Sequence, residues 1–186
     1  MTRLVQLETR ETPSLLRPHL HVMNGGAEPV GRPERVSIRA ARLEDVATMF
    51  ELLDGYARKG LLLPRTIGDV YRNVREFVVA VDEQDRVIGC GGLRVYSPVM
   101  GEIIALAVNE RCHGLGVGRQ IVETLLEQAH AMDMCRVFAM TLQEGFFHKL
   151  GFETTHITAF PEKITFDCSR CAKRAQCIEI AVAIDL

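Results

Sequence analysis

With 186 residues, of which 47% are hydrophobic and 25% charged, the chain has the length and composition of one globular domain, which excludes a disordered or fibrous protein. Its net charge of −2 argues against general binding to nucleic acid or to an acidic membrane. No apolar run approaches the ~20 residues of a membrane helix, so we expect a cytoplasmic protein.

The first 34 residues differ in character from the rest of the chain. The stretch "MNGGAEPVGRP" carries Gly and Pro without apolar periodicity, a pattern typical of flexible segments. We therefore predict a flexible N-terminal tail over residues 1–34 and one folded domain over residues 35–186.

Hydrophobic periodicity predicts the elements of the first half of this domain. "RVSIRAA" alternates like a short strand that begins at Val36, and "LEDVATMFELLDGYA" has apolar residues at helical spacing. Thr66 and Asp69 form a variant capping box that opens a second helix, Ile67 to Val74. "FVVAVDEQDRVIGCGGLRVY" then predicts two strands joined by a polar turn.

The second half begins with "GEIIALAV", a continuous apolar run that predicts a central strand covered on both faces. A glycine-rich loop and a helix with an apolar stripe from Val117 to Met132 follow, and "CRVFAM" supplies the next strand. A short helix around residues 146–149 and a last strand near "IEIAVAID" complete the pattern. We predict an α/β fold with a mixed central β-sheet and flanking helices.

The glycine-rich loop, "RCHGLGVGRQ", has the features of a phosphate-binding site. Glycines let backbone N–H groups converge, and the following helix adds its positive dipole end. "GLGVGR" has the wrong third interval for a dinucleotide-binding loop, and no Lys-Ser or Lys-Thr follows as in a P-loop. An acyl-CoA pyrophosphate site and a plain tight turn remain.

The surrounding residues favour the acyl-CoA site. "AVNERCHGLGVGRQIVETLLEQA" resembles the pyrophosphate-binding motif of the GNAT superfamily of N-acetyltransferases, with Gly116 and Gly118 on its two small positions and His113 in place of the usual Gln or Arg. "FFHKLGFE" resembles a later motif of the same superfamily. The resemblance implies a GNAT-like fold and acetyl-CoA as co-substrate. The residues that it places on the cofactor are Leu106, Ala107, Val108, His113, Gly114, Leu115, Gly116, Val117, Gly118 and Arg119.

A narrower resemblance covers residues 36–165. "KGLLLPRTIGDVYRNVREFVVA", "GCGGL", "GEIIALAV", "FFHKLGF" and "FPEK" are similar, in the same order, to the acetyltransferase domain of N-acetylglutamate synthases, particularly the short bacterial type. The resemblance implies acetylation of L-glutamate for arginine biosynthesis, by direct attack in a ternary complex. A GNAT enzyme that acetylates another amine, and a noncatalytic acyl-CoA-binding regulatory module, are the alternatives.

The reaction needs a base, because an ammonium group has no lone pair with which to attack. Glu102 begins an otherwise apolar strand, where partial desolvation would raise its pKa. It also stands where the superfamily often places a catalytic glutamate, six residues before Val108. A solvated carboxylate at a strand end is the alternative. Many members have a tyrosine at the position of Phe147 to protonate the leaving thiolate, and a phenyl ring cannot do so.

An acidic acceptor needs cationic partners, and Arg suits planar carboxylates best. Arg65 in "LLLPR" matches the arginine that the synthase family uses on glutamate, and Arg75 in "REF" comes second. Lys163 in "FPEK" is a further substrate-binding candidate, with a solvated surface lysine as the alternative. We expect a small-molecule partner, no nucleic acid and no membrane, and a homodimer is one oligomeric state that the sequence leaves open.

Three closely spaced cysteines, Cys168, Cys171 and Cys177, occur in "DCSRCAKRAQC". A structural zinc site requires four ligands, and no fourth ligand is obvious in the sequence. We expect no metal, and favour reduced thiols or a redox pair.

Overall fold

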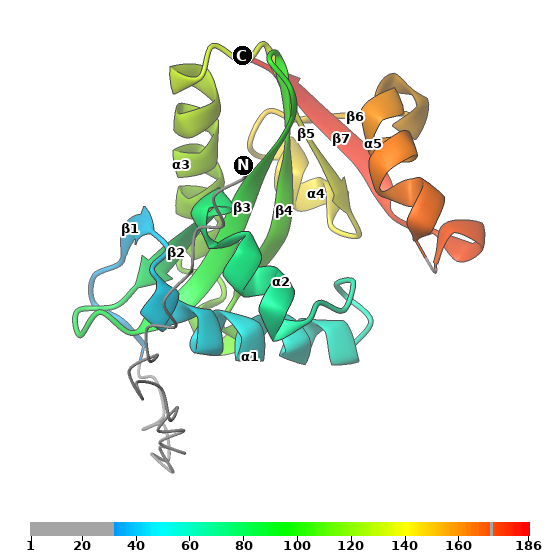
Figure 1. Cartoon of the computed structure of the whole chain (residues 1–186). Coiled ribbons are helices and arrows are strands. Elements are labelled where there is room, and N and C mark those ends of the chain that lie inside the picture. The colour runs from blue at the N-terminus through cyan, green and yellow to red at the C-terminus, as the bar shows by residue number, and fades with distance from the viewer. Residues whose placement is uncertain (1–31, 172) are drawn as a thin grey trace, which may run out of the picture.

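The computed structural model describes residues 32–171 and 173–186. One seven-stranded sheet in the order β1-β2-β3-β4-β5-β7-β6 forms its centre (Figure 1). The strands are β1 (Ser37–Ala40), β2 (Phe77–Val81), β3 (Val87–Ser97), β4 (Met100–Val108), β5 (Arg136–Thr141), β6 (Glu153–Thr155) and β7 (Ile180–Asp185). Only β4 and β5 are parallel, so the sheet is mixed and the predicted fold class is confirmed.

Helices cover both faces of this sheet (Figure 1). They are α1 (Val46–Arg58), α2 (Ile67–Arg72), α3 (Val117–Ala131), α4 (Glu144–His148) and α5 (Pro161–Phe166). Alternate residues of β2 pack on different helices, with Val78 and Ala80 in the core beneath α3 and Val79 in the core beneath α1 and α2. Covering on both faces explains why β2 and β4 are continuous apolar runs rather than alternating ones.

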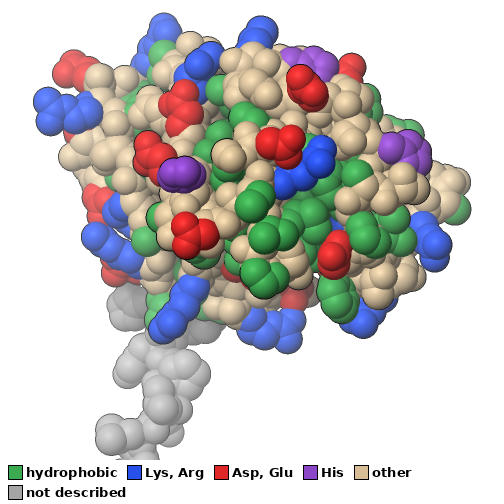
Figure 2. Space-filling model, turned by 90° about the horizontal axis from the view of Figure 1, so that it is seen from above, with side chains coloured by type: hydrophobic (Ala, Val, Ile, Leu, Met, Phe, Trp, Pro, Cys, Tyr) green, Lys and Arg blue, Asp and Glu red, His purple; other side chains and the backbone are tan. Residues whose placement is uncertain are grey.

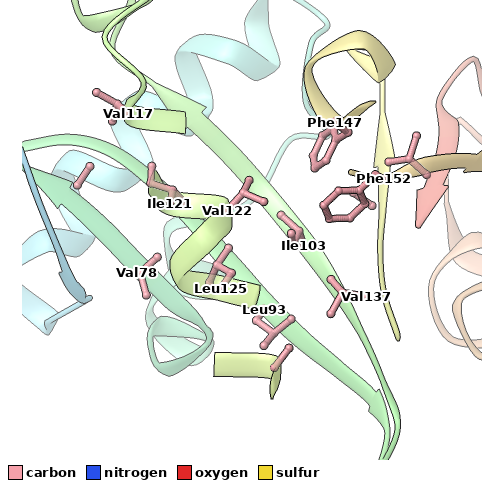
Figure 3. Close-up of a cluster of buried hydrophobic side chains, with 14 of the residues drawn as sticks. Val78, Leu93, Ile103, Val117, Ile121, Val122, Leu125, Val137, Phe147 and Phe152 are labelled. Carbon is pink, nitrogen blue, oxygen red and sulfur yellow. The ribbon is translucent and has the colours of Figure 1, made fainter. Parts of the chain in front are cut away.

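The core on the α3 face is the larger one. Figure 3 shows Ile121, Val122 and Leu125 of α3 lying against strand side chains such as Leu93 and Val137, all of them buried. Because α3 is fixed in this way along its length, its first turn and the glycine loop before it have a defined position at the end of β4.

Close packing between α3 and β3 depends on Gly91. A Cβ atom at this position would lie 2.7 Å from Cγ2 of Ile121, which is closer than such atoms approach. We expect Gly91→Ala to lower the free energy of unfolding by about 1–3 kcal/mol. Gly55→Ala in α1, where a Cβ would meet nothing within 4 Å, is the matched control and should stabilise by about 0.5–1 kcal/mol. Urea unfolding of both variants measures the difference, and equal effects would contradict the packing.

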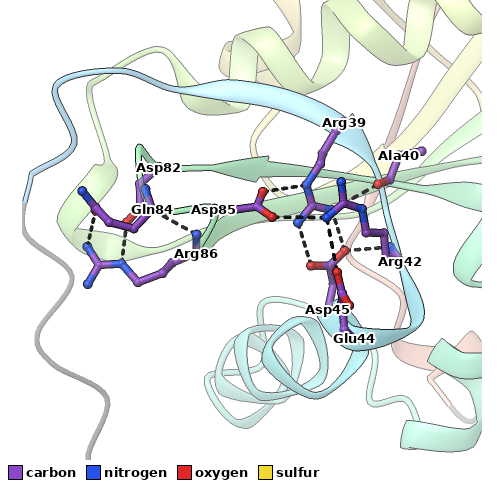
Figure 4. A network of polar contacts seen from close by, with 9 residues as sticks. All are labelled: Arg39, Ala40, Arg42, Glu44, Asp45, Asp82, Gln84, Asp85 and Arg86. Carbon is purple, nitrogen blue, oxygen red and sulfur yellow. Dashed lines mark hydrogen bonds and ion pairs between the residues drawn. The ribbon is translucent and has the colours of Figure 1, made fainter.

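Charged side chains connect β1 to the start of α1 (Figure 4). The Arg39 guanidinium contacts both oxygens of Asp45, at 2.7 and 2.9 Å, and also Asp85. Burial alone would raise the pKa of Asp45, but Arg39 and the Arg42 backbone N–H lower it overall. Elsewhere the surface carries charges of both signs among hydrophobic side chains (Figure 2), in keeping with the small net charge.

Besides shifts of one or two residues at the starts of β1 and α4, the elements differ from the predicted ones in three places. The second helix ends at Arg72 instead of Val74, and a 3₁₀ turn, η2 (Val74–Glu76), follows it. The sequence predicted neither β6 nor α5, whose three and six residues are too few to establish a period. Of the predicted tail, residues 1–31 lie outside the described residues. Among the described helices, none is long and apolar enough to span a membrane.

Candidate functional site

The sheet opens between β4 and β5. The two strands pair only over residues 100–103 and 136–139, although β4 continues to Val108 and β5 to Thr141. A cavity of about 750 Å³ occupies the opening, and its walls come from β4, the glycine loop, the end of β5 and α4. The cavity also reaches residues 61–62, in the loop after α1. It therefore passes from the α3 side of the sheet towards the α1 side.

A β-bulge lies in the wall of this cavity. Ala105 has a φ of +51°, and the register between β3 and β4 shifts between Cys90 and Gly92. Beyond Ile103, β4 has no strand on its β5 side. An extended ligand can lie along this free edge as an added strand would.

The glycine loop closes one end of the cavity. Gly114 and Gly116 both have φ values of +77°, which glycine adopts far more readily than other residues. Gly116 is the N-cap of α3, so the unpaired N–H groups and the positive end of a 15-residue helix face this end. A phosphate or pyrophosphate group fits such an environment.

Nine of the ten residues predicted to contact the cofactor line the cavity, namely Leu106, Ala107, Val108, His113, Gly114, Gly116, Val117, Gly118 and Arg119. Leu115 does not line it, and packs instead against the core beneath α3. Together with the buried Cys112 and Val117 on either side, Leu115 anchors the loop to the domain.

The His113 side chain is held by α1. Its Nε2 atom lies 3.0 Å from the Val108 carbonyl oxygen and 2.8 Å from Tyr56 Oη, and the Tyr56 hydroxyl itself donates to that oxygen at 2.6 Å. The imidazole that replaces the usual Gln or Arg thus fixes the end of β4. The sequence did not identify Tyr56, whose position in α1 carries no motif.

Glu102 lies on the other side of the bulge and is 3% exposed. Burial raises the pKa of its carboxyl, although Lys163 and Tyr96 act in the opposite direction. The expected upward shift is confirmed, and the alternative of a solvated strand-end carboxylate is wrong.

Tyr96, Lys163 and Asp167 surround the Glu102 carboxyl. Tyr96 Oη lies 2.8 Å from Glu102 Oε2, and Lys163 Nζ lies 2.9 Å from the same oxygen and 2.9 Å from Asp167 Oδ2. The Tyr96 hydroxyl also contacts Asp167 Oδ2. Burial alone would lower the pKa of Lys163, but the two carboxylates raise it overall, so the amine stays charged.

Lys163 therefore differs from both descriptions that the sequence offered. Its side chain is 13% exposed, so it is not a solvated surface lysine. Its ammonium is paired with the carboxyl groups of Glu102 and Asp167, each at 2.9 Å. Stacking of Phe160 on Phe138, with ring centroids 4.0 Å apart, fixes the start of α5 and brings Lys163 to β4.

The Arg65 guanidinium, unlike the Lys163 ammonium, is not paired with a carboxylate of the described residues. Burial lowers the pKa of its guanidinium, Arg94 lowers it further, and the carboxylates of Glu102, Glu76 and Asp167 act against both. Among the described residues, none forms an ion pair or a side-chain hydrogen bond with Arg65, whereas Arg94 pairs with Glu76 at 3.1 Å and with Asp167 at 3.8 Å. Arg65 is thus a half-buried cation available to an anionic ligand.

The second arginine that the sequence indicated is not part of this group. Arg75 is exposed in η2, and nearby Arg72 is 75% exposed and pairs with Asp69 in its own helix. The structure brings Arg94 to Arg65 in their place. Arg94 lies opposite Glu102 in the β3–β4 register, and its position in an otherwise apolar strand is the signal that could have identified it.

Phe147 lines the cavity and is buried against Phe146 and Phe152, each with a centroid distance of 5.1 Å. It supplies no proton donor at the position where a tyrosine was expected from the superfamily. The Tyr96 hydroxyl, which the sequence did not identify, belongs to the Glu102 group instead.

The three cysteines lie next to Asp167. Cys168 begins the 3₁₀ turn η5 (Cys168–Arg170), and the Cys171 N–H donates to the Cys168 carbonyl at 3.2 Å. Burial raises the pKa of the Cys168 thiol, and Cys177 and Cys171 raise it further against the effect of Lys163. Among the described residues, no group of three or more His, Cys, Asp or Glu side chains is arranged to hold a metal ion.

Comparisons with known proteins match this arrangement to acetyltransferases. The family model described as "Acetyltransferase (GNAT) family" matches residues 46–152. An uncharacterized N-acetyltransferase of Chlorobaculum tepidum is 37% identical over 145 residues, covering 78% of this chain and 93% of the relative. An amino-acid acetyltransferase of Mycobacterium tuberculosis is 39% identical over 130 residues, covering 67% and 74%.

Two solved structures have the same fold. A Mycobacterium tuberculosis protein in complex with CoA and a second compound is 30% identical with a TM-score of 0.70, covering 81% of this chain and 99% of that one. The N-acetylglutamate synthase of Neisseria gonorrhoeae, complexed with coenzyme A and N-acetyl-glutamate, is 23% identical with a TM-score of 0.74, covering 83% and 36%. The chain thus spans about a third of the latter protein.

Proposed function

Because the chain belongs to the acetyltransferase (GNAT) family, whose co-substrate is acetyl-CoA, we propose that it transfers the acetyl group to the α-amino group of L-glutamate. The observation that carries the choice of acceptor is Arg65, a half-buried guanidinium without a carboxylate partner among the described residues. An acceptor with two carboxylates suits this site, whereas a polyamine or a lysine side chain would be repelled. The product would be N-acetyl-L-glutamate, which belongs to arginine biosynthesis.

The similarities support the same acceptor. The Mycobacterium tuberculosis relative is named an amino-acid acetyltransferase, and the five motifs over residues 36–165 resemble the acetyltransferase domain of N-acetylglutamate synthases. We place the pyrophosphate at the glycine loop, the pantetheine arm along the free edge of β4, and the acceptor between Arg65 and Glu102. Arg75 and Lys163 are not assigned to the acceptor, because the first is exposed and the second is already paired.

In the proposed reaction the acceptor amine attacks the thioester carbonyl directly in a ternary complex. The amine must first lose a proton, and Glu102, which is buried and whose charge acts on Arg65, is the group that we assign to this step. Phe147 supplies no proton donor where the superfamily often has a tyrosine, and a CoA thiol is acidic enough to leave as the thiolate.

A panel of amines tests the acceptor. Purified protein is supplied with acetyl-CoA and with L-glutamate, L-aspartate, L-glutamine, L-lysine or spermidine, and release of the CoA thiol is followed. We expect kcat/KM for glutamate to exceed that for glutamine by roughly 10- to 100-fold, because glutamine leaves a cation without its partner. Aspartate, shorter by one methylene, should be about tenfold or more worse. Equal rates with glutamine, lysine or spermidine would contradict the assignment.

A further inference from the structure

Glu102, Tyr96, Asp167 and Lys163 form a closed ring of polar atoms. Lys163 Nζ lies 2.9 Å from an oxygen of each carboxyl, Tyr96 Oη lies 2.8 Å from Glu102 Oε2, and the Tyr96 hydroxyl also contacts Asp167 Oδ2. A phenol has a single proton, so it can donate to only one of its two carboxyl neighbours. The second contact is a hydrogen bond only if that carboxyl is itself protonated.

Burial decides which carboxyl holds the additional proton. Glu102 is 3% exposed, whereas the Asp167 side chain is 36% exposed and lies 3.8 Å from the Arg94 guanidinium. Two acids that share one site do not both ionise readily, and the more buried one keeps its proton. In that arrangement Glu102 would donate to Tyr96, and Tyr96 would donate to Asp167. With Lys163 charged and Asp167 ionised, the ring has no net charge, which suits its buried position.

We propose that Tyr96 and Asp167 carry the proton of the acceptor amine from Glu102 to solvent. This inference rests on the proposed function, since it assumes an amine beside Glu102. Oε1 of Glu102 makes no hydrogen bond with any described side chain and receives the proton. The amine N–H bond breaks as the Oε1–H bond forms, the Oε2 proton passes to Tyr96 Oη, and the Tyr96 proton passes to Asp167 Oδ2. Asp167 releases it to water, and rotation of the Glu102 carboxyl brings its proton back to Tyr96 for the next cycle.

The ring has no other group that performs this transfer. Lys163 remains an ammonium, because it forms an ion pair with Asp167 at 2.9 Å, and its part is to hold the two carboxyls in place. Glu102 is 3% exposed, and an amine bound at Oε1 covers that oxygen, so the proton leaves through Oε2. The Asp167 side chain is 36% exposed, compared with 13% for Lys163 and 3% for Glu102, so the path ends there.

Asp167→Asn and Tyr96→Phe test the relay. Each should lower kcat by roughly 100-fold, the low end of what a positioned acid–base group contributes, with little change in KM. Because both act on one path, the double variant should be no slower than either single variant. Small carboxylic acids such as formate should accelerate Asp167→Asn but not the wild type, which a merely structural role would not produce. The controls are Glu162→Gln, in the helix α5 that precedes Asp167, and Tyr71→Phe, which changes an exposed tyrosine.

An infrared spectrum tests the shared proton without any acceptor. At neutral pH the wild type should show a protonated carboxyl band that Glu102→Gln lacks, and absence of this band would overturn the ring's proton arrangement even if glutamate is the substrate. If the band is present and another amine is turned over faster than glutamate, the acceptor assignment fails and the relay stands. Full turnover in Asp167→Asn, or single effects that multiply in the double variant, would overturn the relay.

Discussion

Glu102→Gln is expected to lower kcat for acetyl transfer by about 10²- to 10⁴-fold, which is the range for removal of a positioned general base. Glutamine has the shape of the protonated glutamate and can still hydrogen-bond to Tyr96, so the fold and the binding of acetyl-CoA should be retained. Steady-state rates with acetyl-CoA and glutamate, together with the KM for each substrate, provide the measurement. Glu51→Gln, an exposed glutamate of α1, is the control and should be unchanged.

The pH dependence separates a base from a structural residue. In the working form of the ring Glu102 holds one proton and Asp167 holds none, so kcat/KM of the wild type should fall on the acid side as a second proton binds at Asp167. Burial alone would raise the pKa of Asp167, but Tyr96 and Lys163 lower it overall, so this fall should lie at low pH. The apparent pKa of this fall in kcat/KM reflects all the coupled groups of the ring, and the profile of Glu102→Gln should lack it. A variant that keeps full turnover across the pH range would mean that the base is another group.

The raised pKa of Glu102 makes the stability of the protein depend on pH. Burial raises the pKa of Glu102 in the folded protein above the usual value for a glutamate. At pH values between the two, the unfolded chain binds fewer protons than the native one. The contribution of Glu102 to the free energy of unfolding is therefore fully present at low pH and is lost as pH rises through the folded pKa. Glu102→Gln should remove this slope in urea unfolding measured at several pH values.

Most of the fold followed from local patterns. The continuous apolar run of β4, the stripe of α3 and the glycines between them are each determined by neighbours in the sequence, and the structure has all three where they were expected. The end of the second helix was missed by two residues, because Asn73 interrupts it without a glycine or proline to mark the stop. The helix α5 was missed because a single Pro at its first position, without a period, does not distinguish a helix from a loop.

The site was only partly predictable for a different reason. Residues of the glycine loop and β4 are contiguous, so a motif identifies them together. The Glu102 ring joins β3, β4 and the segment after α5, and Tyr96 and Asp167 are separated by 71 positions. No local pattern relates such residues. The register of the β3–β4 hairpin offers a partial signal, because Arg94 lies opposite Glu102 and Tyr96, two residues on, shares its face. Asp167 has no comparable signal, since its place depends on the stacking of Phe160 on Phe138.

Arg65→Ala is expected to raise the KM for glutamate by roughly 100-fold, with kcat changed much less. A hydrogen-bonded ion pair between a guanidinium and a carboxylate contributes about 1.5–3 kcal/mol, and each 1.4 kcal/mol is about tenfold in affinity. The interaction is made equally in the ground state and in the transition state, so its loss appears in KM. The KM for acetyl-CoA should not change.

Matched variants distinguish the guanidinium from mere positive charge. Arg65→Lys keeps the charge but loses the planar pair of donors, so its KM should lie between the wild type and Arg65→Ala. Arg75→Ala and Arg72→Ala remove exposed arginines of the neighbouring segment and should leave the KM for glutamate unchanged. If Arg75→Ala raises KM as much as Arg65→Ala does, the acceptor lies towards η2 and not between Arg65 and Glu102. If neither variant raises the KM for glutamate, the acceptor is not held through its carboxylates. In the described part of the chain, Arg65 is the half-buried arginine that has no carboxylate partner.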